Sequence, residues 1–347
     1  MHSSRLLGCV ARGNSVPTPP DRLTEARRVA CSPLMPGVSV TDRDGNEFVL
    51  NTIVCPACGP STERTIGLRG GAHHWQGRGV ETRIVECTSC GLLYANPYPT
   101  PTDFQRLYAD PEKYFESHDL EGRTRKFRRV ARQILAKCQK PLPSLLDVGS
   151  GRGEMLVAAR DVGFGEVLGL EPSIANREFA AEPGVELIPK MIEEFADETD
   201  RTFDAVTLNA ILEHVPNPDS MIEACARLVA PEGVLYVDIP NEANLLVMIG
   251  NRLNRLFGSE AVLQLSPTFP PYHVFGFTQR STRFLLEKHG FEITSARVAT
   301  WFWVRSDGSI KGRARALAAM RIQPIANATR TAHNMFIFAR RSVPGPG

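Results

Sequence analysis

Leu-Leu-Asp-Val-Gly-Ser-Gly-Arg-Gly, residues 145–153, is the stretch that decides the fold. Four strand-forming residues, 145–148, run into three closely spaced glycines, and a helical pattern follows over 154–162. Glycine tolerates positive φ and leaves room for a ligand beside the backbone, and the first turn of a helix presents free N–H groups. The stretch therefore predicts a strand–turn–helix unit that binds a nucleotide-type cofactor.

The glycine spacing distinguishes between two classes of cofactor. A dinucleotide-binding turn requires Gly-x-Gly-x-x-Gly, whereas this chain has Gly-x-Gly-x-Gly with Glu154 at the position of the third glycine. S-adenosylmethionine has no phosphate and carries positive charge, which Asp147 and Glu154 tolerate. Glu171, at the end of the next strand, can accept hydrogen bonds from both ribose hydroxyls. These features predict S-adenosylmethionine, and the alternative is an ordinary glycine-rich turn in an α/β protein.

Strands and helices alternate beyond Pro143, which predicts a parallel sheet covered on both faces. The expected strands are 145–148, 167–170, 185–188, 203–208 and 234–237. The expected helices are 154–162, 173–181 and 218–229. A helix over 279–289, closed by Gly290, and strands over 291–298 and 334–340 complete the α/β pattern.

Taken together, the chain from about 143 to 341 resembles class I S-adenosylmethionine-dependent methyltransferases. The segments that carry the resemblance are 145–153, 169–173, 203–215 and 231–235. The resemblance is strongest to the branch that includes ubiquinone-biosynthesis O-methyltransferases and methyltransferases of polysaccharide and natural-product pathways. Members of that branch carry segments similar to 55–59, 87–97 and 271–278. The resemblance implies a Rossmann-like seven-stranded sheet with one antiparallel strand near its edge.

The resemblance also implies roles for individual residues. The methionine part of the cofactor would be held by Asp147, Gly149, Ser150, Gly151 and Gly153. Glu171 would hold the ribose, Met191 and Ile192 would flank the adenine, and Asn209 would face the methyl group. Some ubiquinone-pathway relatives look able to bind a divalent metal through two glutamates and a histidine. Glu213 and His214 match two of these positions, but the third is Ala210, so neither a catalytic metal nor a catechol substrate is expected.

Two Cys-x-x-Cys pairs, Cys55/Cys58 and Cys87/Cys90, precede the methyltransferase segment, and a glycine follows each pair. Zinc prefers four thiolates in a tetrahedron, and tight turns of this kind supply two each. The spacing predicts a zinc-ribbon-like module with a closed, structural metal site. A redox dithiol and a site that has lost its metal are the alternatives. The N-terminal residues show no continuous apolar signal-peptide core, so no secretory signal is expected, and this also favours metal ligation over disulfides.

Methyl transfer to a hydroxyl requires removal of a proton, and histidine is the natural base near neutral pH. His214 follows the fourth strand, and His273 lies in the insertion 240–278. Either residue is a candidate base, and a hydrogen bond to a loop carbonyl is the structural alternative for each. The same insertion predicts an amphipathic helix over 245–257. That helix could form a lid, contact a lipid surface or pack on the domain, and packing is the favoured prediction.

The 347 residues carry 40 basic and 38 acidic side chains, a balance that gives no general attraction to nucleic acid or anionic membrane. The expected organisation is a disordered extension over 1–45, a zinc-ribbon-like module over 46–100, a helical linker over 101–142 and a methyltransferase domain over 143–343. No run of about 18 apolar residues occurs, so no membrane span is expected and the prediction is a cytoplasmic protein.

The favoured function is methylation of a small molecule or glycan, at oxygen, with a structural zinc. One alternative is an RNA-modifying enzyme that uses basic residues of a helix over 122–140. Aromatic stacking residues are sparse there, so nucleic acid is not expected as a partner. Another alternative is a non-catalytic cofactor-binding partner protein, because cofactor-binding residues alone do not prove turnover. The acceptor and the oligomeric state are not determined by the sequence.

Overall fold

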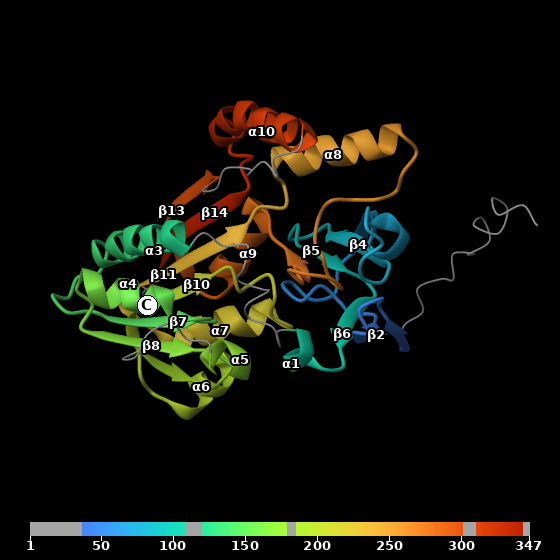
Figure 1. Ribbon diagram of the computed structural model, residues 1–347. Coiled ribbons are helices and arrows are strands. Elements are labelled where there is room, and N and C mark those ends of the chain that lie inside the picture. The colour runs from blue at the N-terminus through green and yellow to red at the C-terminus, as the bar shows by residue number, and fades with distance from the viewer. Residues whose placement is uncertain (1–36, 108–119, 179–184, 301–309, 343–347) are drawn as a thin grey trace, which may run out of the picture.

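A seven-stranded mixed sheet forms the centre of the protein (Figure 1). The computed structural model describes residues 37–107, 120–178, 185–300 and 310–342. The strand order is β13-β14-β11-β10-β7-β8-β9. The bounds are β7 Ser144–Val148, β8 Glu166–Leu170, β9 Glu186–Ile188, β10 Phe203–Asn209, β11 Val229–Pro240, β13 Phe291–Ala299 and β14 Asn334–Arg341. Strand β14 runs antiparallel to the other six strands. This arrangement confirms the expected Rossmann-like methyltransferase sheet.

Helices cover both faces of this sheet. On one face, α3 (Leu120–Leu135) and α4 (Glu154–Val162) pack against the central strands. On the other face lie α6 (Ile192–Glu198), α7 (Pro218–Leu228) and α9 (Gln279–Lys288). The short helix α5 (Ile174–Glu178) follows β8. Helix α3 ends five residues before the expected Lys140, because Pro141 and Pro143 disfavour helical backbone in the residues before them.

The N-terminal part of the chain forms two small sheets. One contains β1 (Val38–Thr41), β2 (Glu47–Asn51) and β6 (Tyr98–Pro101). The other has the order β12-β5-β4-β3, with β3 Glu63–Arg69, β4 Thr82–Cys87, β5 Leu93–Ala95 and β12 Phe275–Gly276. Strand β3 shows no regular alternation of buried residues, and its pairing with β4 defines it. A short helix, α1 (Phe104–Leu107), follows β6.

The insertion after β11 joins the two halves of the molecule. Its strand β12 pairs with β5, so a segment of the methyltransferase region completes an N-terminal sheet. Phe275 and Phe277 are fully buried in the same core as Tyr94 and Cys90. The expected extension 1–45 is described only from residue 37, where β1 soon begins, and its remainder lies outside the described residues. The part of the expected helix 173–181 that falls on 179–181 also lies outside them.

Two further helices, α8 (Leu245–Leu256) and α10 (Ile310–Ala328), lie along the upper edge of the molecule in Figure 1. Helix α8 matches the helix expected in the insertion. The helix packs on the domain, as expected, but through its asparagine side, and most of its apolar residues are exposed. Helix α10 was not anticipated, since its apolar and basic residues are mixed. Among the helices of the described residues, none combines the length and apolar character needed to cross a bilayer.

Candidate functional site

The glycine turn joins β7 to α4 as the sequence predicted. Gly149, Gly151 and Gly153 have φ of 66°, 54° and 77°, in the region that side chains rarely adopt. A Cβ on Gly149 would lie 2.6 Å from Cδ1 of Ile211, so the turn packs closely against the loop after β10. The Ser150 hydroxyl donates to the Asp147 carbonyl at 2.7 Å. The turn is therefore tied to the strand before it and to the neighbouring loop.

Glu171 directly follows β8 and contacts the glycine turn. Its Oε2 accepts a hydrogen bond from the Gly151 N–H at 2.7 Å, and its Oε1 accepts one from the Ser173 N–H at 2.9 Å. Burial raises the pKa of this carboxyl group, and these hydrogen bonds act in the opposite direction. Asn176 Nδ2 also donates to Oε1, at 3.4 Å, whereas Oε2 keeps a second acceptor position. The arrangement fits the expected contact with hydroxyl groups, and it also gives Glu171 a role in shaping the turn.

Asp147 and Asn209 lie side by side at the carboxyl ends of β7 and β10. The Asp147 Oδ1 accepts from the Thr207 hydroxyl at 2.5 Å and from Asn209 Nδ2 at 3.0 Å. Burial raises the pKa of Asp147 to about 7, so a nearby cation would stabilise its ionised form. The Asn209 Oδ1 is buried and accepts no hydrogen bond from the described residues. Buried acceptors are normally paired, so this atom points to a ligand.

One large cavity, of about 2190 Å³, collects the predicted cofactor residues. Its lining includes Asp147, Gly149, Ser150, Gly151, Glu171, Met191, Ile192 and Asn209. Gly153 is not part of the lining, because it starts α4 and lies behind the turn. Met191 caps the start of α6 and Ile192 follows it, so both contribute an apolar wall beyond β9. The volume exceeds the roughly 300–1,000 Å³ of a typical ligand pocket, which leaves space for a second molecule beside the cofactor.

His214 and His273 lie on the same cavity, with Glu213 between them. Their ring centroids are 4.8 Å apart. His214 Nε2 is 3.8 Å and His273 Nε2 is 3.9 Å from Glu213 Oε1, which is too long for a hydrogen bond. The backbone N–H groups of Val274 and Phe275 donate to the Glu213 carbonyl at 2.9 and 3.2 Å. The insertion is therefore pinned to the loop after β10, and this brings His273 to the site.

The three side chains are buried to different extents. The side chain of His214 is 9% exposed and that of His273 is 21% exposed, whereas that of Glu213 is 3% exposed. Burial lowers the pKa of His214 to about 4 and lowers that of His273 well below its usual value. Burial raises the pKa of Glu213 to about 8, and both carboxyl oxygens have no hydrogen-bond partner among the described residues. At neutral pH the cluster is therefore uncharged or nearly so.

Glu213 is a site residue whose setting the sequence analysis missed. The sequence analysis considered it only as part of an incomplete metal pattern around the fourth strand. The structure supplies a different neighbour, His273, and the ligand atoms of Glu213, His214 and His273 lie within 4.8 Å of one another. That spacing would also suit a cation. Comparison of positions around one strand could not reveal this, because His273 comes from the distant insertion.

Lys126 and Asp238 form a second polar feature of the cavity that the sequence analysis did not identify. The Lys126 Nζ lies 2.6 Å from Asp238 Oδ2, and Asn334 Nδ2 donates to Asp238 Oδ1 at 3.3 Å. Lys126 belongs to the basic helix that one alternative assigned to RNA. The structure turns this lysine toward the cavity, while Arg128 pairs with Asp161. The basic helix is therefore partly committed to contacts within the protein.

The N-terminal sheets provide the wall opposite the glycine turn. Phe48 of β2, Tyr98 of β6 and the segment 51–54 line the cavity together with Pro271 and Tyr272. Tyr98 stacks on Phe275 of β12 with ring centroids 5.6 Å apart. The acceptor side of the cavity is thus formed by two segments far apart in the sequence. The large apolar share of this wall suits an acceptor with an extended apolar or ring-shaped part.

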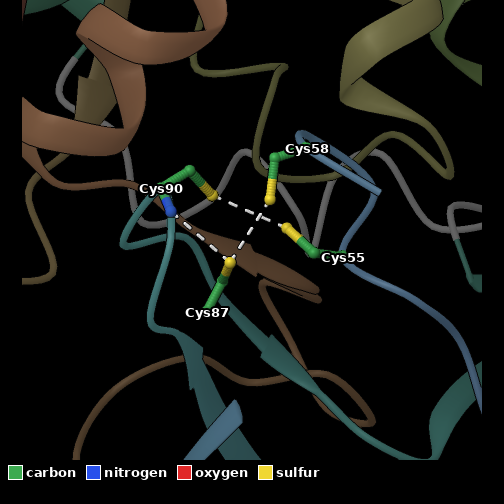
Figure 2. A group of neighbouring side chains, drawn as sticks. All are labelled: Cys55, Cys58, Cys87 and Cys90. Carbon is green, nitrogen blue, oxygen red and sulfur yellow. Dashed lines mark hydrogen bonds between the residues drawn. The ribbon is translucent and has the colours of Figure 1, made fainter. Parts of the chain in front are cut away.

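The four predicted cysteines converge in space, as Figure 2 shows. Cys55 Sγ lies 3.6 Å from Cys90 Sγ, and Cys58 Sγ lies 3.4 Å from Cys87 Sγ. Zinc–sulfur bonds of about 2.3 Å in a tetrahedron place sulfurs about 3.8 Å apart, close to these separations. The hydrogen bond to Cys90, with burial, raises the pKa of Cys55. Burial also raises the pKa of Cys58, to about 11, so a cation would be needed to hold all four as thiolates.

His73 and His74 were expected to be loop residues between the cysteine pairs, and neither belongs to this cysteine group. His73 ends a short 3₁₀ helix over Gly71–His73 and pairs with Glu81 at 2.9 Å. His289, expected at the surface, is largely buried and lies 2.7 Å from Asp219 Oδ1. His118 lies outside the described residues.

Comparison with known proteins identifies the family of the chain. A family model described as "Methyltransferase domain" matches residues 119–296. Ubiquinone biosynthesis O-methyltransferase of Aliivibrio fischeri is 36% identical over 129 residues, which cover 35% of this chain and 53% of that protein. The same-named protein of Pectobacterium atrosepticum is 32% identical over 160 residues, which cover 43% and 64%. The chain thus spans about half the length of the curated relatives it matches.

Solved structures are similar at a lower level. An S-adenosylmethionine-dependent methyltransferase from Archaeoglobus fulgidus has 17% identity and a TM-score of 0.46, covering 69% of this chain and all of that one. The family match covers more than half of the chain and includes the glycine turn, Glu171 and the loop after β10. The chain therefore belongs to the methyltransferase domain family, as a class I S-adenosylmethionine-dependent methyltransferase related to ubiquinone-biosynthesis O-methyltransferases.

Proposed function

We propose that this protein transfers a methyl group from S-adenosylmethionine to a hydroxyl oxygen of a small molecule or glycan. The observation that carries the proposal is a pair of orphaned polar groups on one cavity. The Asn209 Oδ1 and both Glu213 carboxyl oxygens are buried without partners among the described residues, and both residues line that cavity. Asn209 adjoins the glycine turn through Asp147, and Glu213 adjoins the two histidines. A methyl donor bound beside Asn209 and a methyl acceptor bound beside Glu213 would provide hydrogen-bond partners for both side chains.

The residues around the glycine turn fit S-adenosylmethionine. Asp147, Gly149, Ser150 and Gly151 would contact its methionine part, and Gly153 would set the start of α4 behind the turn. Glu171 would accept from the ribose, and Met191 and Ile192 would flank the adenine. Asn209 would face the methyl group. When bound, this cofactor supplies a methyl group on a sulfonium that is already activated, so the protein mainly contributes proximity and alignment.

His273 is the favoured base for the acceptor hydroxyl, and His214 is its rival. His273 is the more exposed of the two to the cavity. His214 already has its Nδ1 3.3 Å from the Tyr272 carbonyl. A neutral imidazole with a lowered pKa is ready to accept a proton at neutral pH, but it is a weak base. Glu213 would compensate when it ionises beside the imidazolium, since an opposite charge raises the pKa of the histidine.

The cysteine cluster is proposed to hold one structural zinc ion. Four cysteines close the tetrahedral coordination shell, so no position remains for a substrate. The cluster lies in the core that the N-terminal sheets share with α7 and α9, and these sheets supply one wall of the cavity. Zinc would therefore affect catalysis only through the shape of that wall. We likewise propose that 46–100 acts as this module, 101–142 as a helical cover and 143–343 as the catalytic domain.

The acceptor class is proposed from the names of the relatives and from the cavity. The curated relatives are named for ubiquinone biosynthesis O-methylation, and the cavity wall formed by Phe48, Tyr98 and Tyr272 suits a ring or an extended apolar group. The test is incubation of purified protein with S-adenosylmethionine labelled in the methyl group and a metabolite extract, followed by mass spectrometry. A labelled product lost with His273→Ala supports the proposal. Label recovered only in RNA, or no label transfer despite tight cofactor binding, counts against it.

A further inference from the structure

Helix α8 presents its apolar side chains to the outside of the molecule. Leu246, Ile249, Leu253 and Leu256 recur at intervals of three and four residues, which places them on one face of the helix. All four are exposed, and Leu256 reaches 73% exposure. Phe257, which follows the helix, is 85% exposed. We define these five residues as the α8 stripe.

The opposite face of α8 is polar and binds the protein. Asn251 Nδ2 donates to Gln264 Oε1 at 2.6 Å, and Asn251 Oδ1 accepts from the Leu263 N–H at 2.9 Å. Asn254 Nδ2 donates to the Ala261 carbonyl at 2.8 Å. A Cβ on Gly250 would come within 2.2 Å of Leu263 Cδ1, so the helix is held tightly on this side. The usual apolar-in, polar-out arrangement of a surface helix is therefore reversed in α8.

Positive charge flanks the α8 stripe. Met248, Arg252 and Arg255 form the adjacent row of the helix and are exposed. Neither arginine forms an ion pair with any residue that the structure describes. The nearest acidic residues in the sequence are Glu242 and Glu260, outside the segment 243–259. Unpaired arginines beside an apolar stripe are typical of helices that lie in the plane of an anionic membrane surface.

Helix α10 also exposes apolar residues beside basic ones. Leu317, Met320 and Ile325 are exposed apolar residues of this helix, and Arg313 and Arg321 are exposed beside them. The Leu245 N–H at the start of α8 donates to the Thr331 carbonyl just after α10 at 2.8 Å, so the two helices adjoin. The segments 243–259 and 310–330 contain no Asp or Glu and seven basic residues, namely Arg252, Arg255, Lys311, Arg313, Arg315, Arg321 and Arg330. A chain with a net charge of only +2 has thus concentrated cations here.

We propose that the α8 stripe and the adjoining exposed residues of α10 dock this protein onto an anionic phospholipid surface. The exposed leucines and Phe257 would enter the boundary between headgroups and acyl chains, and the arginines would contact lipid phosphates. Contiguous exposed apolar residues on a protein surface mark an interaction site, and the absence of carboxylates selects an anionic partner. This docking is separate from the catalytic cavity, since neither the α8 stripe nor its arginines line that cavity.

Cosedimentation of the full-length protein with vesicles tests the proposal. One set of vesicles is phosphatidylcholine alone, and the other is a mixture of phosphatidylcholine and phosphatidylglycerol. Binding is expected to the mixed vesicles and to fall in high salt, because counterions screen exposed charges. Arg252→Gln/Arg255→Gln should weaken binding about fivefold for each arginine removed. Ile249→Ser/Leu253→Ser should also weaken binding to the mixed vesicles, since it removes apolar area.

Matched controls lie elsewhere on the surface. Leu142→Ser changes a leucine near β7 that is more exposed than Ile249 or Leu253, and Arg283→Gln changes an exposed arginine of α9. Both should bind vesicles like the unchanged protein, and all variants should keep affinity for S-adenosylhomocysteine, which verifies folding. Equal binding by the α8 variants and the controls overturns the proposal. Failure of the unchanged protein to bind mixed vesicles also overturns it. In that case, analytical ultracentrifugation would show whether the α8 stripe instead forms a dimer that the α8 variants abolish.

Discussion

His273 Nε2 and Glu213 Oε1 lie 3.9 Å apart across the cavity, although one residue comes from the insertion after β11 and the other from the loop after β10. The neighbouring His214 Nε2 is 3.8 Å from the same oxygen. Two neutral imidazoles therefore share one buried carboxyl group. We propose that the cluster handles the proton of the acceptor, and single substitutions can separate the contributions of its members.

His273→Ala should lower kcat by roughly a hundredfold or more, the usual effect of losing a general base. Affinity for S-adenosylhomocysteine should stay unchanged, because His273 lies on the acceptor side of the cavity. Steady-state kinetics and calorimetry measure the two quantities. His214→Ala is the matched comparison. Near-normal turnover of His273→Ala with an inactive His214→Ala would transfer the role of base to His214.

Cofactor binding should depend on the glycine turn and on Glu171. Gly151→Val should block binding, since the residue has φ of 54° and lines the cavity, and a branched side chain is strained there. Glu171→Ala should weaken binding by about 1.5–3 kcal/mol, the range for hydrogen bonds to a charged group. Calorimetry with S-adenosylhomocysteine tests both. Glu178→Ala, an exposed position on α5, is the control, and unchanged affinity in all three variants would exclude the proposed binding site.

Zinc should be present at one ion per chain and should be required for folding of the N-terminal sheets. Cys55→Ser/Cys58→Ser should release it and increase proteolysis within residues 46–100, because the metal would join the two cysteine turns. Elemental analysis and limited proteolysis are the measurements. Cys138→Ser is the control, since Cys138 lies outside the cluster and bonds the Ile134 carbonyl. A zinc-free double variant with normal protease resistance and activity would contradict a structural role.

Stability should fall as pH rises through the range in which Glu213 titrates. Its pKa is about 8 in the folded protein and about 4.5 in an unfolded chain. The folded state therefore binds the proton more tightly, and this contribution is complete below pH 4.5 and is lost as pH rises toward 8. The slope is at most about 1.4 kcal/mol per pH unit. Each kcal/mol corresponds to about 1–2 °C in Tm for a chain of 347 residues.

Glu213→Gln should flatten the dependence of Tm on pH between about pH 7 and 8.5, because the amide does not titrate. This pH range is chosen because His214, whose pKa is lowered, makes stability depend on pH in the opposite direction at lower pH. His214 stabilises the fold above pH 6.5, and that contribution is lost as pH falls toward 4. Above pH 7 the histidine is neutral in both states and drops out. Identical slopes for the variant and the unchanged protein would show that Glu213 is not the titrating group.

The central sheet was determined largely by sequence. Leu145–Val148 followed by the glycine turn, and the later strands spaced by helices, predicted β7, β8, β10 and the late antiparallel pair close to their observed bounds. Hydrophobic runs bounded by glycine and proline are local signals, so they can be read without tertiary information. The convergence of Cys55, Cys58, Cys87 and Cys90 was likewise predictable, since spacing alone specifies two paired turns.

Tertiary structure decided the acceptor side of the cavity. His273 was recognised as a candidate, but its place beside Glu213 depends on backbone hydrogen bonds between the insertion and the loop after β10. In the sequence, Lys126 is one of several basic residues of a helix. In the structure, the position of α3 brings it to Asp238. Neither relationship has a local signature, because each joins residues that are distant in sequence.

The orientation of α8 shows most clearly which features the sequence determines and which features depend on tertiary contacts. The sequence determined that residues 245–256 form an amphipathic helix, because leucines recur at helical spacing between asparagines and arginines. Periodicity specifies which residues share a face, but it does not specify which face meets the protein. Asn251 and Asn254 found partners in Gln264, Leu263 and Ala261. Only that tertiary pairing decided that the apolar face would point outward.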